Sequence, residues 1–233
     1  MKLQLLEELL AAGRTNVPTA LVTHLATGAQ ALVSKTGAKG DLTLDSEVRT
    51  RVLQALDDDQ SRVLDGALFV EVWNPRPRLL VVGAVHAAQE LVPMARAAGY
   101  DVVVIDPRTA FSTSARFPDT TLRQDWPDEA LLALAPDRRT AILTLTHDPK
   151  IDDPALVAAL RSEAFYIGAL GSRGTHAKRI ERLKDRGFDD ATISRIRGPV
   201  GLAIGARTPM EIAISIMAEI TAVLRRAPLG HRT

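Results

Sequence analysis

The 233-residue sequence predicts an α/β fold in which a doubly wound parallel sheet follows a smaller α+β domain. From about residue 78, short continuous apolar runs alternate with helical segments, as expected for parallel strands buried on both faces. Before that point two β-rich runs lie close together, and a third strand-like segment alternates apolar with polar residues. Pro75 and Pro77 interrupt any helix or ladder between the two parts. We therefore expect a small domain over 1–74 and a Rossmann-like domain over 75–233.

The first domain should contain two helices and a few antiparallel strands. Leu3, Leu6 and Leu10 recur at helical spacing, and Gly13 is placed to end that helix. Residues 26–28, Ala-Thr-Gly, lie between two β-rich runs and predict a hairpin turn. The expected elements are helices over 1–12 and 45–56 and strands over 17–25, 29–34 and 67–73.

The second domain should alternate strands and helices. Its last helix opens with Thr208-Pro209-Met210-Glu211, a capping box with proline at the first helical position. The apolar face of this helix suits either the core or the seam of a homodimer, and periodicity does not decide between them. The expected elements are strands over 79–83, 101–105, 140–145 and 165–169, and helices over 87–98, 130–135, 154–161, 175–186, 191–195 and 209–226.

Composition excludes several classes of function. The 29 lysines and arginines balance 28 acidic residues, so no basic footprint for nucleic acid or an anionic membrane is present. The absence of cysteine excludes disulfides, thiolate zinc sites, iron–sulfur clusters and a cysteine nucleophile. No apolar run is long enough to span a bilayer, and the N-terminus does not resemble a signal peptide. We therefore expect a cytoplasmic protein.

The loop that follows the first strand of the second domain partly matches a dinucleotide fingerprint. Gly83 and the small residue Ala88 are present, and Asp106 ends the next strand, where a ribose-binding carboxylate would lie. Val85 replaces the glycine that lets a pyrophosphate approach the backbone. NAD(P) is therefore less favoured as a ligand, and the alternative is that Gly83 only makes a tight turn.

Two further strand ends carry polar residues. Thr146-His147-Asp148-Pro149-Lys150 follows the third strand, and its histidine could serve as acid/base, metal ligand or hydrogen-bond donor. The alternative is a simple turn into a helix led by Asp152, Asp153 and Pro154. The glycine-rich segment 168–176 precedes a helix and is the strongest anion-binding signal, with Arg173 as a possible bidentate contact. The basic residues beyond it, at 178–186, are interpreted as a solvated helix face.

The segment 198–208 contains three glycines and one proline. Such a loop has a specified conformation and brings Arg207 to the start of the last helix. A binding role and a purely structural role remain equally open.

Four segments together resemble the XdhC/CoxI family, accessory proteins of xanthine dehydrogenase and related molybdenum hydroxylases. They are Thr146–Lys150, Phe165–Arg173, Thr175–Arg179 and Gly205–Pro209, in the family's order and spacing. The resemblance covers about residues 78–226. It implies a Rossmann-like C-terminal domain and a non-catalytic chaperone that binds molybdenum cofactor (molybdopterin), permits its maturation and passes it to an apo xanthine dehydrogenase-type enzyme. A cysteine desulfurase is a further candidate partner.

Under this resemblance the terminal phosphate of the pterin is expected at Gly171–Thr175. No catalytic residue is assigned and the metal ligands are left open. The expected cofactor-binding residues are Gly83, His86, Asp106, Arg108, Thr146, His147, Asp148, Lys150, Gly171, Ser172, Arg173, Thr175, His176 and Arg207.

The sequence departs from the family in two places. Val85 stands where members have glycine in Gly-Ala-Gly-His, and the N-terminal Cys-Val-Glu motif has no counterpart in a chain without cysteine. A thiolate would be the natural soft ligand for molybdenum or carrier for sulfur. Two alternatives therefore stay open: an NAD(P)-dependent oxidoreductase with Asp106 on the ribose and His147 as acid/base, and a partner-binding scaffold without a ligand.

Overall fold

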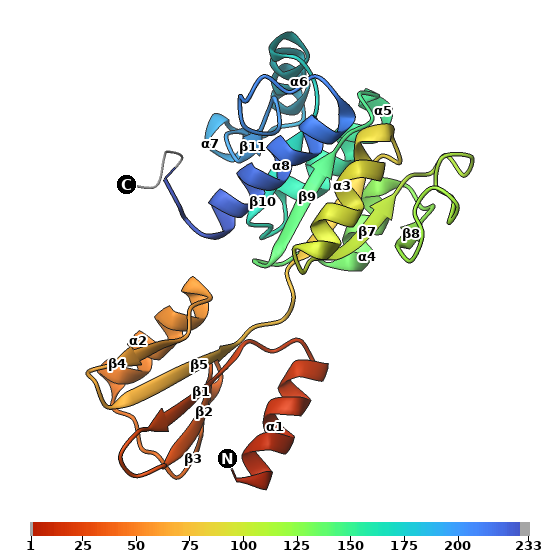
Figure 1. Ribbon diagram of the computed structural model, residues 1–233. Coiled ribbons are helices and arrows are strands. Elements are labelled where there is room, and N and C mark those ends of the chain that lie inside the picture. The colour runs from red at the N-terminus through yellow and green to blue at the C-terminus, as the bar shows by residue number, and fades with distance from the viewer. Residues whose placement is uncertain (1, 229–233) are drawn as a thin grey trace. The chain divides into compact units, whose positions relative to one another are not determined.

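The computed structural model describes residues 2–228, and the chain divides into two compact units between Pro75 and Arg76 (Figure 1). The N-terminal unit has a five-stranded antiparallel sheet and the C-terminal unit a six-stranded parallel sheet. The predicted α/β fold class is confirmed. None of the helices in the described residues is long and apolar enough to cross a membrane.

The N-terminal sheet has the strand order β3-β2-β1-β5-β4 and is covered by one helix on each face. Its elements are α1 (Leu3–Arg14), β1 (Thr19–His24), β2 (Gln30–Ser34), β3 (Gly37–Gly40), α2 (Ser46–Asp58), β4 (Arg62–Leu64) and β5 (Leu68–Trp73). The predicted β1–β2 hairpin is present, and Gly28 supplies the positive φ of 72° in its turn. β3 and β4 were not predicted, because segments of four and three residues are too short to show a strand periodicity.

The first helix uses a different face from the one expected. Leu5 and Leu9 are buried against Leu21 and Leu32 of the sheet, whereas the leucines at 3, 6 and 10 are exposed. The helix also continues through Gly13 to Arg14, and Asn16 takes the left-handed conformation that ends it, at φ 55°. The predicted C-terminal glycine is therefore wrong.

The C-terminal sheet has the strand order β11-β10-β9-β6-β7-β8, and every pair is parallel. In chain order this is the Rossmann arrangement, with its topological switch between β6 and β9. The elements are β6 (Arg78–Val82), α3 (His86–Ala97), β7 (Asp101–Ile105), β8 (Thr121–Arg123), α4 (Pro127–Leu134), β9 (Thr140–Thr144), α5 (Pro149–Leu160), β10 (Tyr166–Ala169), α6 (Arg173–Asp185), α7 (Asp190–Ile193), β11 (Ile196–Arg197) and α8 (Pro209–Leu224).

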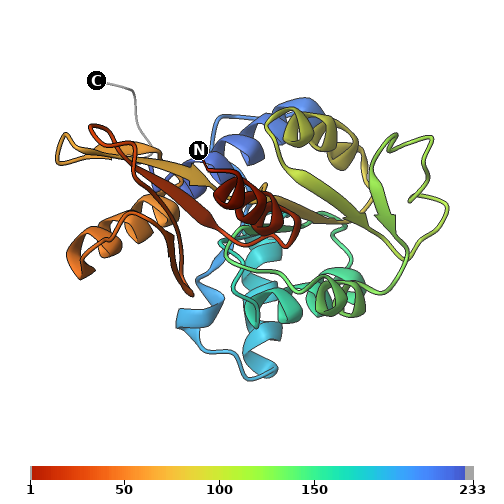
Figure 2. The same cartoon turned by 90° about the horizontal axis from the view of Figure 1, so that it is seen from below.

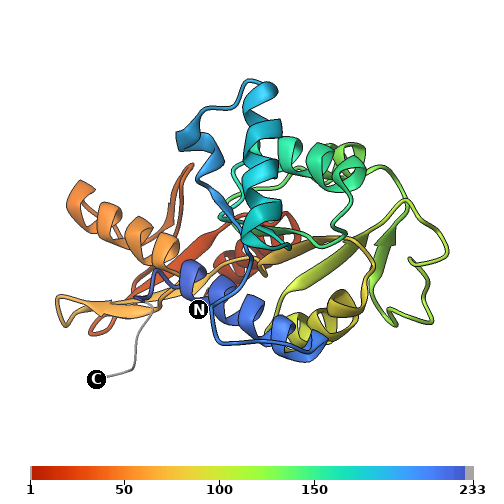
Figure 3. The same ribbon diagram turned by 90° about the horizontal axis from the view of Figure 1, so that it is seen from above.

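Two helical layers enclose this parallel sheet. Figure 2 shows α3 and α8 on one side, and Figure 3 shows α4, α5 and α6 on the other. Ile216 and Ile220 of α8 are fully buried in the core that α3 shares. The apolar face of α8 is therefore core, and it offers no separate support for a homodimer. The predicted capping box at Thr208 and Glu211 is confirmed.

The start of α5 corrects the sequence prediction. The helix begins at Pro149, not Pro154, and its N-cap is Asp148, whose side chain accepts a hydrogen bond from the Lys150 amide at 2.9 Å. Pro154 therefore lies inside the helix, and Asp152 and Asp153 lie in its buried first turns. β8 and β11 were also missed, as edge strands of three and two residues.

Candidate functional site

The predicted loops converge at the carboxyl edge of the parallel sheet. The loops after β6, β7, β9 and β10 all leave the sheet at this edge, because every strand runs in the same direction. In open α/β sheets, ligands bind beyond this edge at the switch point. The structure therefore brings these candidate segments to the same edge of the sheet.

The β6 and β9 loops touch at Gly83. Its φ is +112°, and a Cβ there would lie 2.7 Å from the Thr146 methyl carbon. Glycine is thus required both by the backbone conformation and by the close approach. His86, one residue beyond Val85, is the first residue of α3 and is exposed.

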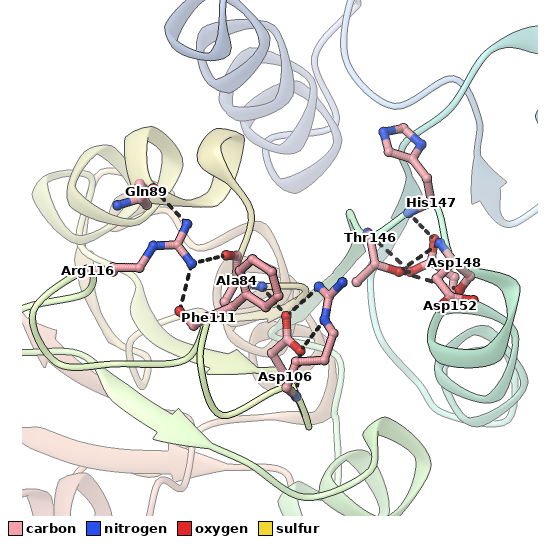
Figure 4. A network of polar contacts seen from close by, with 10 residues as sticks. Ala84, Gln89, Asp106, Phe111, Arg116, Thr146, His147, Asp148 and Asp152 are labelled. Carbon is pink, nitrogen blue, oxygen red and sulfur yellow. Dashed lines mark hydrogen bonds and ion pairs between the residues drawn. The ribbon is translucent and has the colours of Figure 1, made fainter.

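The Asp106 carboxylate makes its hydrogen bonds within the protein and is not free to bind a ribose. Its side chain is fully buried, and its oxygens accept hydrogen bonds from the Ala84 amide (2.8 Å) and from Arg108 through the amide (3.0 Å), Nε (2.9 Å) and Nη2 (2.8 Å). Figure 4 shows Asp106 turned toward Ala84. The carboxylate expected to face a ribose is thus already engaged. This removes the main support for the nicotinamide alternative.

The charge of Asp106 depends on these contacts. Burial by itself would raise the pKa of Asp106, but the Arg108 guanidinium and the Ala84 amide outweigh it and hold the pKa below the usual 3.8. A depressed folded pKa stabilises the protein above pH 3.8, and this stabilisation is lost as the pH falls through the folded value. We expect Asp106→Asn to flatten the acid limb of unfolding stability, measured by denaturant titration between pH 5 and about pH 2. An unchanged acid limb would contradict this assignment.

The segment between β7 and β8 is fastened over the first loop by Arg116. Its Nη1 donates to the carbonyl oxygens of Ala84 and Phe111, each at 2.8 Å, and its Nη2 donates to Gln89 Oε1 at 2.9 Å (Figure 4). The Phe111 ring lies 4.7 Å from the Arg108 guanidinium and 5.7 Å from that of Arg116. Arg116 and Phe111 were not predicted from the sequence, since no local pattern marks a loop residue that forms a hydrogen bond with a strand end 32 positions away.

The β9 loop is organised around the buried carboxylate of Asp152. This carboxylate accepts hydrogen bonds from the Thr146 hydroxyl (2.7 Å), the Thr146 amide (3.3 Å) and the His147 amide (3.1 Å). His147 has the unusual φ of 63°, and its ring points away from Asp152 (Figure 4). A non-glycine residue held in this conformation by tertiary contacts often marks a functional position. Of the other two candidates, Asp148 caps α5, and Lys150 is exposed.

Asp152 faces Arg179 of α6, and both side chains are 2% exposed. The Asp152 Oδ2 to Arg179 Nη2 distance is 3.9 Å, and Nη2 also donates to the Leu170 carbonyl at 2.8 Å. Nη1 donates to His176 Nδ1 at 3.4 Å, whereas Nε is buried and has no hydrogen-bond partner within residues 2–228. Burial raises the pKa of Asp152, and burial lowers that of Arg179.

The expectation of a solvated basic face on α6 is therefore wrong for two of its members. Arg179 is buried as described, and Arg182 is half-buried in a bidentate pair with the buried Asp153, at 2.6 and 2.9 Å. The sequence could not reveal this, because both acids lie on α5, outside the local pattern of α6.

A pocket of about 360 Å³ opens between the β9 loop and the start of α6. Ser172 caps α6 by accepting a hydrogen bond from the Thr175 amide at 3.1 Å, so the positive end of the helix dipole faces the pocket. Gly171, at φ +141°, precedes this cap. The pocket is lined by His147, Pro149, Asp152, Ser172, Gly174, Thr175, Lys178, Arg179 and Arg182.

Of the fourteen predicted site residues, three line this pocket, His147, Ser172 and Thr175, and the other eleven do not. Arg173 is exposed at the first position of α6, and Arg207 is exposed beside the capping box of α8. His176 is half-buried, and its ring fills the space that a side chain at Gly198 would need. Burial, aided by the Arg179 charge, lowers the pKa of His176. Across residues 2–228, no three histidine or acidic side chains are grouped closely enough to hold a metal ion.

The strand order of the parallel sheet, with a pocket between the loops that follow β9 and β10, defines a Rossmann-fold domain. The family model described as the XdhC Rossmann domain matches residues 79–220, more than half of the chain. The protein therefore belongs to the XdhC family.

Relatives and a solved structure agree with this assignment. The chain is 31% identical over 216 residues to the uncharacterized protein YqeB of Escherichia coli, covering 83% of this chain and 39% of that one. It is 33% identical to the molybdenum cofactor insertion chaperone PaoD of E. coli, covering 65% and 41% of the two chains. It is also 33% identical to a protein of Bacillus subtilis that is named as a probable xanthine dehydrogenase component, covering 68% and 46%.

The crystal structure of a xanthine dehydrogenase from Bacillus halodurans matches with a TM-score of 0.74 and 26% identity. It covers 98% of this chain and 66% of that chain. The chain spans less than half the length of the three relatives named above.

Proposed function

We propose that this protein binds molybdenum cofactor and assists its maturation and its insertion into a xanthine dehydrogenase-type enzyme, without catalysing a reaction itself. Family membership and the name of the relative PaoD support molybdenum cofactor as the cargo. The name of the B. subtilis relative supports a xanthine dehydrogenase-type enzyme as the client. A cysteine desulfurase partner, a homodimer and a cytoplasmic location remain predictions from the sequence.

The observation that carries the proposal is the pocket at the start of α6. Molybdopterin ends in a phosphate, and a helix N-terminus with nearby cations suits a phosphate group. Lys178 and Arg182 line this pocket, and buried Arg179 contributes a guanidinium whose Nε finds no hydrogen-bond partner in the described part of the chain. An unpaired buried donor is costly unless a ligand satisfies it. We place the phosphate here, over Ser172–Thr175.

The pterin, rather than the metal, is proposed as the part of the cargo that the protein holds. A chain without cysteine offers no thiolate to molybdenum, and no metal-binding cluster of histidine and acidic residues is present in residues 2–228. Recognition of phosphate and ring leaves the metal accessible for sulfuration and transfer.

Lys178→Ala should weaken retention of the cofactor roughly 30-fold, because it removes one charge-assisted contact of about 2 kcal/mol. Sequence analysis favours Arg173 as the phosphate contact, but Arg173 lies outside the pocket lining, and Lys178 lies in it. Arg173→Ala is therefore a matched control that removes one cation from the same helix and should have a smaller effect. Protein purified from cells that make the cofactor is oxidised, and pterin fluorescence per chain is measured.

Equal pterin in wild type and Lys178→Ala would contradict the phosphate placement. Wild-type protein that carries no pterin but is stabilised thermally by NAD(P) would favour the oxidoreductase alternative instead. A chain that responds to neither ligand would favour the scaffold alternative.

A further inference from the structure

Arg108 follows β7 at the carboxyl edge of the sheet and is held in a fixed orientation. Its Nε and Nη2 donate to the two oxygens of buried Asp106, and its guanidinium lies 4.7 Å from the Phe111 ring centre. Arginine held along one edge by a carboxylate and across one face by an aromatic ring loses little further entropy when it binds a ligand. Within the described residues no group accepts a hydrogen bond from its remaining nitrogen, Nη1, and the side chain is 35% exposed.

Arg108 follows β7 at the same carboxyl edge of the sheet as the phosphate pocket, outside the lining of that pocket. Besides Asp106, the carboxylates of Asp148 and Asp152 lie close enough to interact with its charge, and Asp152 also lines the pocket. β7 and β10 are separated by β6 and β9, so their ends are three strand spacings, or about 14 Å, apart. A ligand with its phosphate at α6 would therefore extend across the switch point toward Arg108.

We propose that Arg108 is a specificity-determining residue that donates from Nη1 to the ring carbonyl of a phosphorylated 2-amino-4-oxopyrimidine heterocycle. Guanidinium carries only donors, so it favours a carbonyl oxygen and disfavours an exocyclic amino group at the same place. This inference rests on the proposed function for its cargo, since a pterin has this ring. The inference adds the residue that recognises the ring of the cargo, at the end remote from the phosphate.

The test uses small probes that share this chemistry. GMP carries a phosphate and a 2-amino-oxopyrimidine ring, whereas AMP presents an amino group in place of the carbonyl. Calorimetric titration of the full chain with GMP, AMP and inorganic phosphate measures each affinity. We expect wild type to bind GMP at least about tenfold more tightly than AMP, and inorganic phosphate to compete with both.

Arg108→Gln should reduce the preference for GMP to near unity and leave the affinity for inorganic phosphate unchanged within about twofold. Arg138→Gln is the matched control, because Arg138 pairs with exposed Glu163. Arg138 lies in the α4–β9 connection, at the opposite edge of the sheet from the carboxyl ends of the strands. Thermal unfolding of both variants checks that they fold. The wild-type preference tests the proposal even if Arg108→Gln does not fold.

Equal wild-type affinity for GMP and AMP, or a preference that survives in folded Arg108→Gln, would overturn the assignment of Arg108. These outcomes are distinguishable from failure of the proposed function. Wild type that retains pterin but shows no ring preference contradicts only the role of Arg108. Wild type that shows the Arg108-dependent preference but carries no pterin supports Arg108 and contradicts the molybdenum cofactor as cargo.

Discussion

Asp152→Ala is expected to lower the free energy of unfolding of the C-terminal unit by about 3–5 kcal/mol. The substitution leaves the buried Arg179 guanidinium without its carboxylate and removes the acceptor of the Thr146 and His147 amides. Removing one partner of a buried ion pair costs more than the pair contributes, because the remaining charge stays desolvated. Urea unfolding of the full chain, followed by circular dichroism, measures the loss.

Asp185→Ala provides the control for this experiment. Asp185 is exposed at the end of α6 and also replaces an acid by alanine, so its effect should stay within about 0.5 kcal/mol. If Asp152→Ala lowered the free energy of unfolding no more than Asp185→Ala does, Asp152 would not organise the β9 and β10 loops. Asp152→Ala should also lose bound pterin, because His147 and Ser172 line the pocket from the β9 and β10 loops.

Gly83→Ala should destabilise the protein by about 3 kcal/mol. Two costs combine at this position: a φ of +112°, which side-chain residues rarely adopt, and a Cβ only 2.7 Å from the Thr146 methyl and 3.2 Å from the Thr146 amide nitrogen. The neighbour is partly backbone, so it cannot simply turn aside. Thermal and urea unfolding measure the combined loss.

Gly99→Ala separates the two costs. Gly99 has a comparable φ of +88°, but nothing lies within 4 Å of a Cβ built there. The decrease in the free energy of unfolding of Gly99→Ala should therefore reflect backbone strain alone, about 1–2 kcal/mol. Adding Thr146→Ser to Gly83→Ala removes the nearest methyl carbon and should restore about 1 kcal/mol. Equal losses at Gly83 and Gly99, with no rescue, would show that the β6 and β9 loops do not press against each other.

The order and type of the elements in the C-terminal unit could be predicted well. β7 has the predicted bounds, because five apolar-rich residues buried on both faces leave little choice of register. The glycine-rich segment before α6 was also found, since capping and left-handed turns leave local residue signatures. The sequence could thus predict which loops meet at the carboxyl edge, but not the individual contacts within them.

Helix faces and buried charges could not be predicted in the same way. In α1, leucines at 5 and 9 compete with those at 3, 6 and 10 for the same periodicity, and only the sheet beneath selects the first pair. From the sequence, Arg179 is indistinguishable from the other cations of a basic helix. Only the structure shows that Asp152, 27 positions earlier, lies opposite it.

By itself, the sequence determined the doubly wound α/β plan, the glycine-rich loop and N-cap at the α6 start, where an anion site is predicted, and the resemblance to the XdhC family. These features depend on local hydrophobic periodicity, turn residues and motif order. Only the tertiary structure decided that Asp106 is already bound by Arg108, that Arg173 lies outside the pocket, and that Lys178 and Arg179 line it. Burial and pairing decide whether a charge can reach a ligand, and both arise from residues that are distant in the chain.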